Sequence, residues 1–186
     1  MPFYGEAPNL EKARKLLADA GFPNGFTIKT LAAPQYRSHI LVAEVLQQQL
    51  AKIGIKLDIQ VTEWGVLLNN WGKNSFETIT MTYAGRSDPY FYTYERLHST
   101  SPGNASRLND PEIDKLSEEG ATISDPAARK AVYDRLQKRM AEMSALVYVA
   151  TETEQFAMRN GVEGYVGMPD GTRGYLAETH LRSACR

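Results

Sequence analysis

VAEVLQQQLAKIGIKLDIQV, residues 42–61, is the most informative stretch of the chain because it changes from a helical to a strand period at a single glycine. Up to residue 53, apolar residues recur every three or four positions with glutamines and a lysine between them, which predicts an amphipathic helix. Gly54 follows, and glycine most readily takes the left-handed conformation that ends a helix. Residues 55–61 then alternate apolar and polar, which predicts a strand with one buried face. The expected inward stripe of the helix consists of Val42, Val45, Leu46, Leu50 and Ile53.

The segments on either side continue this alternation of elements. Residues 64–71 predict a short amphipathic helix, and residues 76–83 predict a strand in which apolar residues alternate with threonines. Upstream, Asn9 is a suitable N-cap for a helix over residues 10–20, and residues 26–31 predict a strand. Strands separated by helices favour parallel βαβ units. We therefore predict an α/β fold with a mainly parallel sheet flanked by helices.

Two helices in the second half are marked by their first residues. Asp110 and Asp125 each precede a proline, an order typical of an N-cap followed by the first helical residue. The helix after Asp125 is predicted to bury one stripe, made of Ala128, Val132, Leu136, Met140 and Met143.

The chain changes character after these helices. Residues 146–150 are a continuous apolar run, which predicts a strand buried on both faces, and residues 155–158 predict another short strand. Farther on, glycines and a proline interrupt every period. We expect one α/β lobe over residues 1–162 and an extended C-terminal tail over residues 163–186.

Composition excludes several classes of function. A net charge of −1 gives no electrostatic reason to expect a nucleic acid or an anionic membrane as partner. No apolar run reaches the length of a membrane span. The three histidines and the single Cys185 are not at metal-binding spacing, and no nucleophile-elbow, dinucleotide or Walker motif is present. These features disfavour metal-dependent and familiar hydrolytic or nucleotide-dependent enzymes.

Function is expected where the predicted strands end. The segments 33–37, 62–64 and 84–88 follow three strands, and in a parallel sheet such segments meet at one edge, where ligands bind. In the last segment, Gly85 would let the backbone approach a ligand, and Arg86 offers a planar fork of donors suited to a carboxylate. The alternative is that Arg86 only pairs with Asp88 or another surface carboxylate.

Aromatic residues accompany these segments. Tyr90 is the most suitable of a group of aromatics after Asp88 to touch a ligand, although such residues more often build a core. Trp64 is expected to pack beneath the cleft, with direct contact to the ligand as the alternative, and Tyr36 is a further candidate for ligand contact. The candidate ligand-binding residues are Arg86, Asp88, Gly85, Tyr83, Tyr90, Trp64 and Tyr36.

An ordered set of segments resembles one protein family. The set comprises LEKARKLLADAGFPNGF at 10–26, the quoted stretch, EW at 63–64, DP at 88–89, LHS at 97–99, NDPEIDKL at 109–116 and DPAARKAVY at 125–133. Together they resemble the second lobe of extracytoplasmic solute-binding proteins of family 5, which deliver peptides, nickel and related solutes to ABC importers. The resemblance implies one lobe of a periplasmic-binding-protein-like (type II) fold.

The resemblance also implies a function and a missing part. Solute would be captured between two lobes and passed to membrane permease subunits, with no cofactor and no catalysis. Such proteins carry a signal peptide and a first lobe, so we expect this chain to be a C-terminal part of a longer protein. In peptide-binding relatives the loop holding Arg86 follows a tryptophan and carries an acidic residue for the ligand's ammonium group. If Arg86 occupies that acidic position, a ligand carboxylate is favoured instead.

Two readings from other classes stay open at this stage. The chain could be a stand-alone α/β enzyme domain acting on small anionic substrates, or a solute-sensing module of a regulator. His98 precedes Ser99, but the sequence identifies no acidic partner for it, so a structural role is the better interpretation. The identity of the solute is not specified by the sequence.

Overall fold

A three-stranded parallel sheet organises the first half of the molecule. The computed structural model describes residues 7–83, 86–144, 146–151, 155–168 and 174–182. The strand order is β2-β1-β3, with β1 (Thr27–Ala32) between β2 (Lys56–Val61) and β3 (Thr78–Ile79). Both neighbours run parallel to β1, which confirms the predicted fold class. Because β3 pairs only at Thr78 and Ile79, it is much shorter than the alternation at 76–83 predicted.

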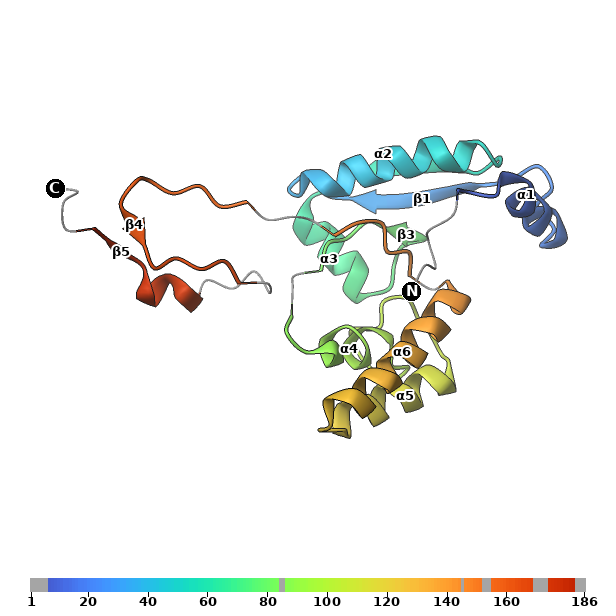
Figure 1. Ribbon diagram of the computed structural model, residues 1–186. Helices are drawn as coiled ribbons and strands as arrows, with labels where there is room; N and C mark the ends of the chain where they lie inside the picture. The colour runs from blue at the N-terminus through green and yellow to red at the C-terminus, as the bar shows by residue number, and fades with distance from the viewer. Residues whose placement is uncertain (1–6, 84–85, 145, 152–154, 169–173, 183–186) are drawn as a thin grey trace.

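Helices connect the strands and cover the sheet. Figure 1 shows α2 (Arg37–Ala51) along one face of the sheet and α3 (Trp64–Gly72) on the other, with α1 (Leu10–Asp19) beyond the amino end of β1. The side chain of Asn9 accepts a hydrogen bond from Lys12 N–H, as expected of the N-cap of α1. The predicted helix at 42–53 begins five residues earlier, and its residue Val45 is half exposed.

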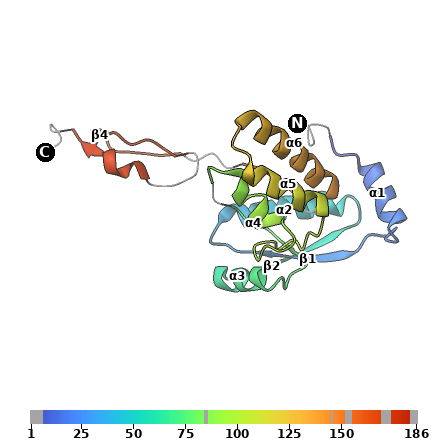
Figure 2. The ribbon, with the colours of Figure 1, turned by 90° about the horizontal axis from the view of Figure 1, so that it is seen from below.

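The second half is a helical layer with the main hydrophobic core. It contains η1 (Pro89–Phe91), α4 (Tyr94–Leu97), α5 (Pro111–Thr122) and α6 (Pro126–Met143), packed together as Figure 2 shows. The core cluster consists of Leu97, Leu108, Ile113, Leu116, Val132, Tyr133, Leu136 and Met140. Both predicted aspartate caps are confirmed. Of the predicted α6 stripe, Val132, Leu136 and Met140 belong to the core cluster, whereas Ala128 and Met143 at its two ends are exposed.

The two strands predicted after α6 are absent. Residues 146–151 and 155–158 form no helix or strand, and Val147 and Tyr148 are 67% and 54% exposed. The prediction was wrong because an apolar run indicates a need for burial without specifying the partner. No strand of the described chain pairs with these residues.

The C-terminal segment is extended but not without structure. Val162–Glu163 (β4) pairs antiparallel with His180–Leu181 (β5), and η2 (Gly174–Glu178) lies between them. Figures 1 and 2 show this ribbon standing away from the lobe. Cys185 lies outside the described residues. Within those residues, no helix combines the length and apolar character needed to cross a bilayer.

Two left-handed glycines meet where α1 and α2 lead into their strands. Gly54 has a φ of +89°, as predicted, and Gly25 has a φ of +73°. A Cβ added at Gly25 would lie 1.9 Å from the carbonyl oxygen of Gly54, whereas a Cβ at Gly54 itself would lie 3.4 Å from its nearest neighbour. The two turns therefore touch backbone to backbone, and only Gly25 is required for both conformation and space.

We predict that Gly25→Ala destabilises the chain more than Gly54→Ala, as measured by urea unfolding. Gly54→Ala should cost about 1–2 kcal/mol, the usual penalty of a left-handed non-glycine residue. Gly21→Ala is the matched control, because Gly21 has a φ of +89° with no atom within 4 Å of the added Cβ. Equal losses at all three positions would show that the contact between Gly25 and Gly54 contributes nothing.

Candidate ligand-binding site

The carboxyl ends of the three strands lie on one edge of the sheet. Beyond the regular pairing, Thr62 N–H donates to Ala32 O at 3.0 Å, and Thr80 N–H donates to Leu31 O at 3.0 Å. The segments that follow β1, β2 and β3 therefore start side by side, as the sequence predicted. In open α/β sheets this edge is the usual place for a ligand.

Two predicted site residues meet here around a histidine. The rings of Tyr36 and Trp64 lie 5.0 Å apart, edge to face, and the His39 ring lies 5.0 Å from Tyr36 and 5.9 Å from Trp64. His39 is only 2% exposed, whereas Tyr36 is 42% exposed. Tyr36, His39 and Trp64 together form an aromatic cluster. Sequence reasoning missed His39 because it started the helix at residue 42, although the three-residue spacing from Tyr36 matches one helical turn.

Tyr83 packs inward from the end of β3. The guanidinium carbon of Arg96 lies 5.0 Å from the Tyr83 ring centroid and 5.3 Å from that of Trp71. Burial raises the pKa of Tyr83, opposed by the charge of Arg96 and a hydrogen bond with Trp71. These contacts make Tyr83 an anchor of the loop.

Arg86 has an exposed side chain on the same loop. Its guanidinium carbon lies 5.5 Å from the centroid of the Phe91 ring, and its backbone N–H donates to the Tyr92 hydroxyl at 2.6 Å. Among the described residues, no carboxylate lies within ion-pair distance of Arg86. Gly85, the neighbouring predicted residue, lies outside the described residues.

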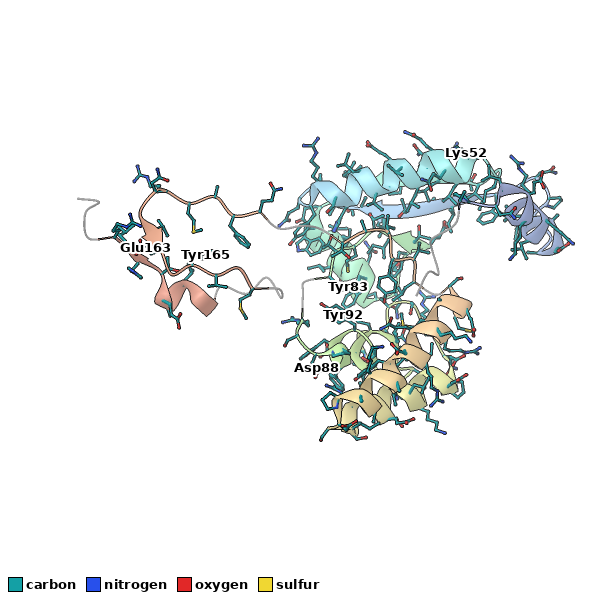
Figure 3. All side chains as sticks on the ribbon, in the orientation of Figure 1. Lys52, Tyr83, Asp88, Tyr92, Glu163 and Tyr165 are labelled. Carbon is teal, nitrogen blue, oxygen red and sulfur yellow. The ribbon has the colours of Figure 1, made fainter. Side chains whose placement is uncertain are left out.

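Asp88 pairs with Arg129 and not with Arg86. The Arg129 side chain of α6 donates to both Asp88 carboxylate oxygens at 2.9 Å, and Asp88 also accepts a hydrogen bond from Tyr90 N–H at 2.8 Å. Arg129 first, and Tyr90 second, lower the pKa of Asp88. Figure 3 shows Asp88 beside α4, with Tyr92 between it and Tyr83. Asp88 thus anchors the loop to the helical layer through Arg129. It does not form an ion pair with Arg86.

Tyr90 begins a column of stacked rings. The rings of Tyr90 and Tyr94 lie 5.2 Å apart and nearly parallel, and Tyr94 stacks on His98 at 4.3 Å. His98 accepts from Thr100 N–H at Nδ1, so its Nε2–H donates to Glu118, 3.2 Å away. The acidic partner that the sequence did not identify lies on α5. This pattern supports the structural role expected for buried His98.

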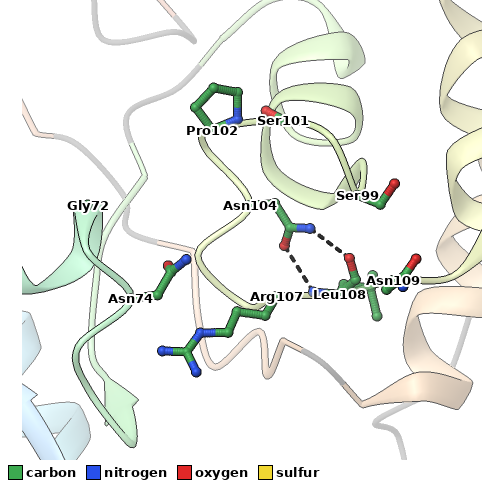
Figure 4. A pocket seen from close by; sticks show the side chains of 9 residues that line it. All are labelled: Gly72, Asn74, Ser99, Ser101, Pro102, Asn104, Arg107, Leu108 and Asn109. Carbon is green, nitrogen blue, oxygen red and sulfur yellow. Dashed lines mark hydrogen bonds between the residues drawn. The ribbon is translucent and has the colours of Figure 1, made fainter.

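A cavity of about 590 Å³ lies elsewhere (Figure 4). It is lined by Gly72, Asn74, Ser99, Ser101, Pro102, Asn104, Arg107, Leu108 and Asn109, none of which is a predicted site residue. Gly72 is at the opposite end of α3 from Trp64. The Asn104 amide donates to Leu108 O at 2.7 Å and accepts from Leu108 N–H at 3.1 Å, so it serves to hold the loop. The aromatic cluster and Arg86 are therefore preferred as the candidate site.

Comparison with known proteins gives the family. The model described as bacterial extracellular solute-binding proteins, family 5 Middle, matches residues 1–104. This chain belongs to that family, and its fold is that of one lobe of a type II periplasmic binding protein.

Three related proteins illustrate the similarity. Di/tripeptide-binding protein 4 of Pseudomonas aeruginosa is 31% identical over 86% of this chain and 31% of its own length. The structure of AgaA from A. tumefaciens R10 in complex with agropinic acid matches with a TM-score of 0.72 and 29% identity, covering 94% of this chain and 37% of AgaA. Oligopeptide-binding AppA of Bacillus subtilis, with a nonapeptide, gives a TM-score of 0.78 and 25% identity over 95% of this chain and 39% of AppA. The chain thus spans about a third of the length of these relatives.

The lowered pKa of Asp88 generates a prediction about stability and pH. Its contribution is present above the unfolded-state pKa of about 4 and is lost as the pH falls through the lower folded-state value. Asp88→Asn should therefore lower the free energy of unfolding at pH 7 by up to about 1 kcal/mol, since the pair is partly exposed. Urea unfolding at pH 7 and pH 3 measures this, and the difference from wild type should shrink at pH 3.

The matched control is Asp134→Asn on the outer face of α6. Asp134 pairs with the exposed Lys130 one turn away, which is worth only about 0.3–0.5 kcal/mol. A loss in Asp88→Asn that is no larger than in this control, or that is the same at both pH values, would contradict the anchoring role of Asp88.

Proposed function

We propose that this chain is the second lobe of a solute-binding protein that captures a small peptide-like or other carboxylate-bearing solute for an ABC importer. The observation that carries the proposal is the edge of the sheet, where the aromatic cluster stands beside the loop of Arg86. Aromatic faces can stack on a solute, and a guanidinium that pairs with no carboxylate of the described residues can pair with an anionic group.

The named relatives support this class of solute. One is named for di- and tripeptides, one was solved with a nonapeptide and one with agropinic acid. Peptides end in a carboxylate, and agropinic acid is an acid by name. Arg86 is the described loop residue whose chemistry suits such a group, and we assign it that role. Tyr36, Trp64 and Tyr90 would form the wall around it, while Tyr83 and Asp88 hold the loop in place.

The mechanism follows from the size of the chain. Because this lobe is about a third of the length of its relatives, it supplies only one wall, and the rest of the protein would supply the other. A solute that contacts both walls favours the closed arrangement by its differential affinity for it. The closed form would then be recognised by permease subunits outside the cytoplasmic membrane. No bond is made or broken in this scheme.

The apolar segment after α6 suggests a further contact between this lobe and the rest of the protein. Its large exposed side chains include Val147, Tyr148, Val149, Phe156, Met158 and Val166. Large apolar side chains that are exposed so close together in the sequence suggest an interaction surface. We propose that residues 147–151, 155–168 and 174–182 pack against the remainder of the two-lobed protein. The tail expected from the sequence, residues 163–186, would be the last part of this surface.

We predict that Arg86→Ala weakens an acidic solute at least about tenfold in the two-lobed protein, because a charge-paired hydrogen bond in a closed cleft is lost. Isothermal titration with di- and tripeptides, each compared with its C-terminal amide, measures this. The loss should be confined to peptides with a free carboxylate, and the melting temperature should stay unchanged.

Arg135→Ala is the matched control, since Arg135 is an exposed arginine on the outer face of α6. It should bind both peptide forms as wild type does. If Arg86→Ala instead lowers the melting temperature while affinity per folded molecule is unaltered, Arg86 is structural and the proposed site is misplaced.

A further prediction concerns the 186-residue chain by itself. One wall offers only part of the contacts, so the chain alone should show negligible affinity for the peptides that the two-lobed protein binds. Calorimetric titration of both proteins with the same peptide makes the comparison. Tight, saturable binding to the single lobe would contradict the two-wall mechanism.

A further inference from the structure

The strand that leads into the Arg86 loop loses its sheet partner before the loop begins. Thr80 makes the last contacts with β1, its N–H and its hydroxyl both donating to Leu31 O at 3.0 and 3.3 Å. Two residues later, the N–H of Thr82 donates to Nε2 of His39 at 3.0 Å. A side chain from α2 therefore replaces the sheet as the partner of the backbone immediately before Tyr83.

The direction of this bond defines the state of the imidazole. A backbone N–H can only donate, so Nε2 must be the nitrogen without a proton, and the neutral ring carries its proton on Nδ1. If His39 gains a second proton, Nε2 can no longer accept from Thr82. The Thr82 hydroxyl, 3.2 Å from Nε2, could then accept from the ring instead, but the backbone amide would lose its partner.

His39 also connects this backbone to the rest of the candidate site. Its ring lies against Tyr36 and Trp64, which follow the other two strands. His39 is 2% exposed, so its ring is enclosed by protein. The three strand-end segments thus meet on a single side chain.

We propose that His39 is a positioning residue for the solute-binding loop and that it holds the loop only while its imidazole is neutral. The proposal rests on the proposed function for its biological meaning, but its test requires no solute. Acidification would release the Thr82 amide and loosen the start of the loop that carries Arg86.

The titratable residues beside the contacts of His39 in the sequence keep the same charge over the pH range in which histidine titrates, so the change in charge is expected at the imidazole. Glu63, next to Trp64, is held ionised because the backbone N–H groups of Gly65 and Val66 lower its pKa. Tyr83, next to Thr82, stays neutral because burial raises its pKa. Tyr36 contributes a phenol ring to the contact. Between about pH 5 and 8, the range in which histidine side chains titrate, Glu63 and Tyr83 therefore keep constant charge.

Amide hydrogen exchange measured by NMR on the ¹⁵N-labelled 186-residue chain tests the proposal. The protection of Thr82, relative to an unstructured peptide at the same pH, should fall about tenfold from pH 8 to pH 5, as expected for the loss of one hydrogen bond. Thr80 is the internal control, because its amide donates to a carbonyl that does not titrate and should keep its protection. Imidazole ¹⁵N shifts at pH 8 should show the proton on Nδ1.

Two variants separate the acceptor from the packing. His39→Gln supplies an amide oxygen that accepts without titrating, so Thr82 should be protected with no pH step. His39→Phe keeps an aromatic ring beside Tyr36 and Trp64 but removes the acceptor, so Thr82 should exchange rapidly at every pH. If His39→Phe does not fold, the wild-type profile and His39→Gln still decide.

A pH-independent Thr82 amide in the wild type, or a step that persists in His39→Gln, overturns the proposal. Loss of protection at Thr80 together with Thr82 also overturns it, since the whole strand would then be opening. Because no solute enters the measurement, a confirmed role of His39 with no peptide binding would count against the proposed function alone.

Discussion

The pairing of β1 with a parallel neighbour on each side is the constraint on which the rest of this molecule depends. β1 pairs with β2 along its whole length and with β3 at its carboxyl end, so all three strands finish at one edge. That shared direction brings Tyr36, Trp64 and Thr82 together from positions far apart in the sequence. Parallel pairing requires crossover helices, and these place α2, with His39 near its start, over the same edge.

The loop after β3 depends on side chains, because the sheet no longer holds it. His39 accepts from the Thr82 amide, Tyr92 accepts from the Arg86 amide, and Arg129 pairs with Asp88. Each anchor comes from a different element, so the loop joins the sheet to the helical layer. The loop is thereby fixed through backbone groups and Asp88, and none of the ion pairs among the described residues involves the Arg86 guanidinium. In the proposed function, the Arg86 side chain can bind the solute because other groups anchor the loop.

Much of the local structure was predictable because its causes are local. Gly54 ends a helix, Asp110 and Asp125 cap helices before prolines, and the 55–61 alternation forms a strand, each from neighbouring residues alone. The family resemblance was also carried by such short segments in order. The prediction of a strand at 146–150 was wrong because its cause would not have been local. Burial on both faces requires partners that a run of apolar residues cannot name.

The α/β class, the shared edge of the strand ends, and the choice of Arg86 and the aromatic residues as candidates could all be inferred from sequence. Which of these side chains are committed to the fold follows instead from contacts between residues far apart in the chain. Asp88 pairs with Arg129, which is 41 residues away, and His98 pairs with Glu118, which is 20 residues away. His39 reaches Thr82 over 43 residues. The physical reason is that an ion pair or hydrogen bond depends on distances of a few ångströms, and the sequence shows such distances only between residues about one helical turn or one strand repeat apart.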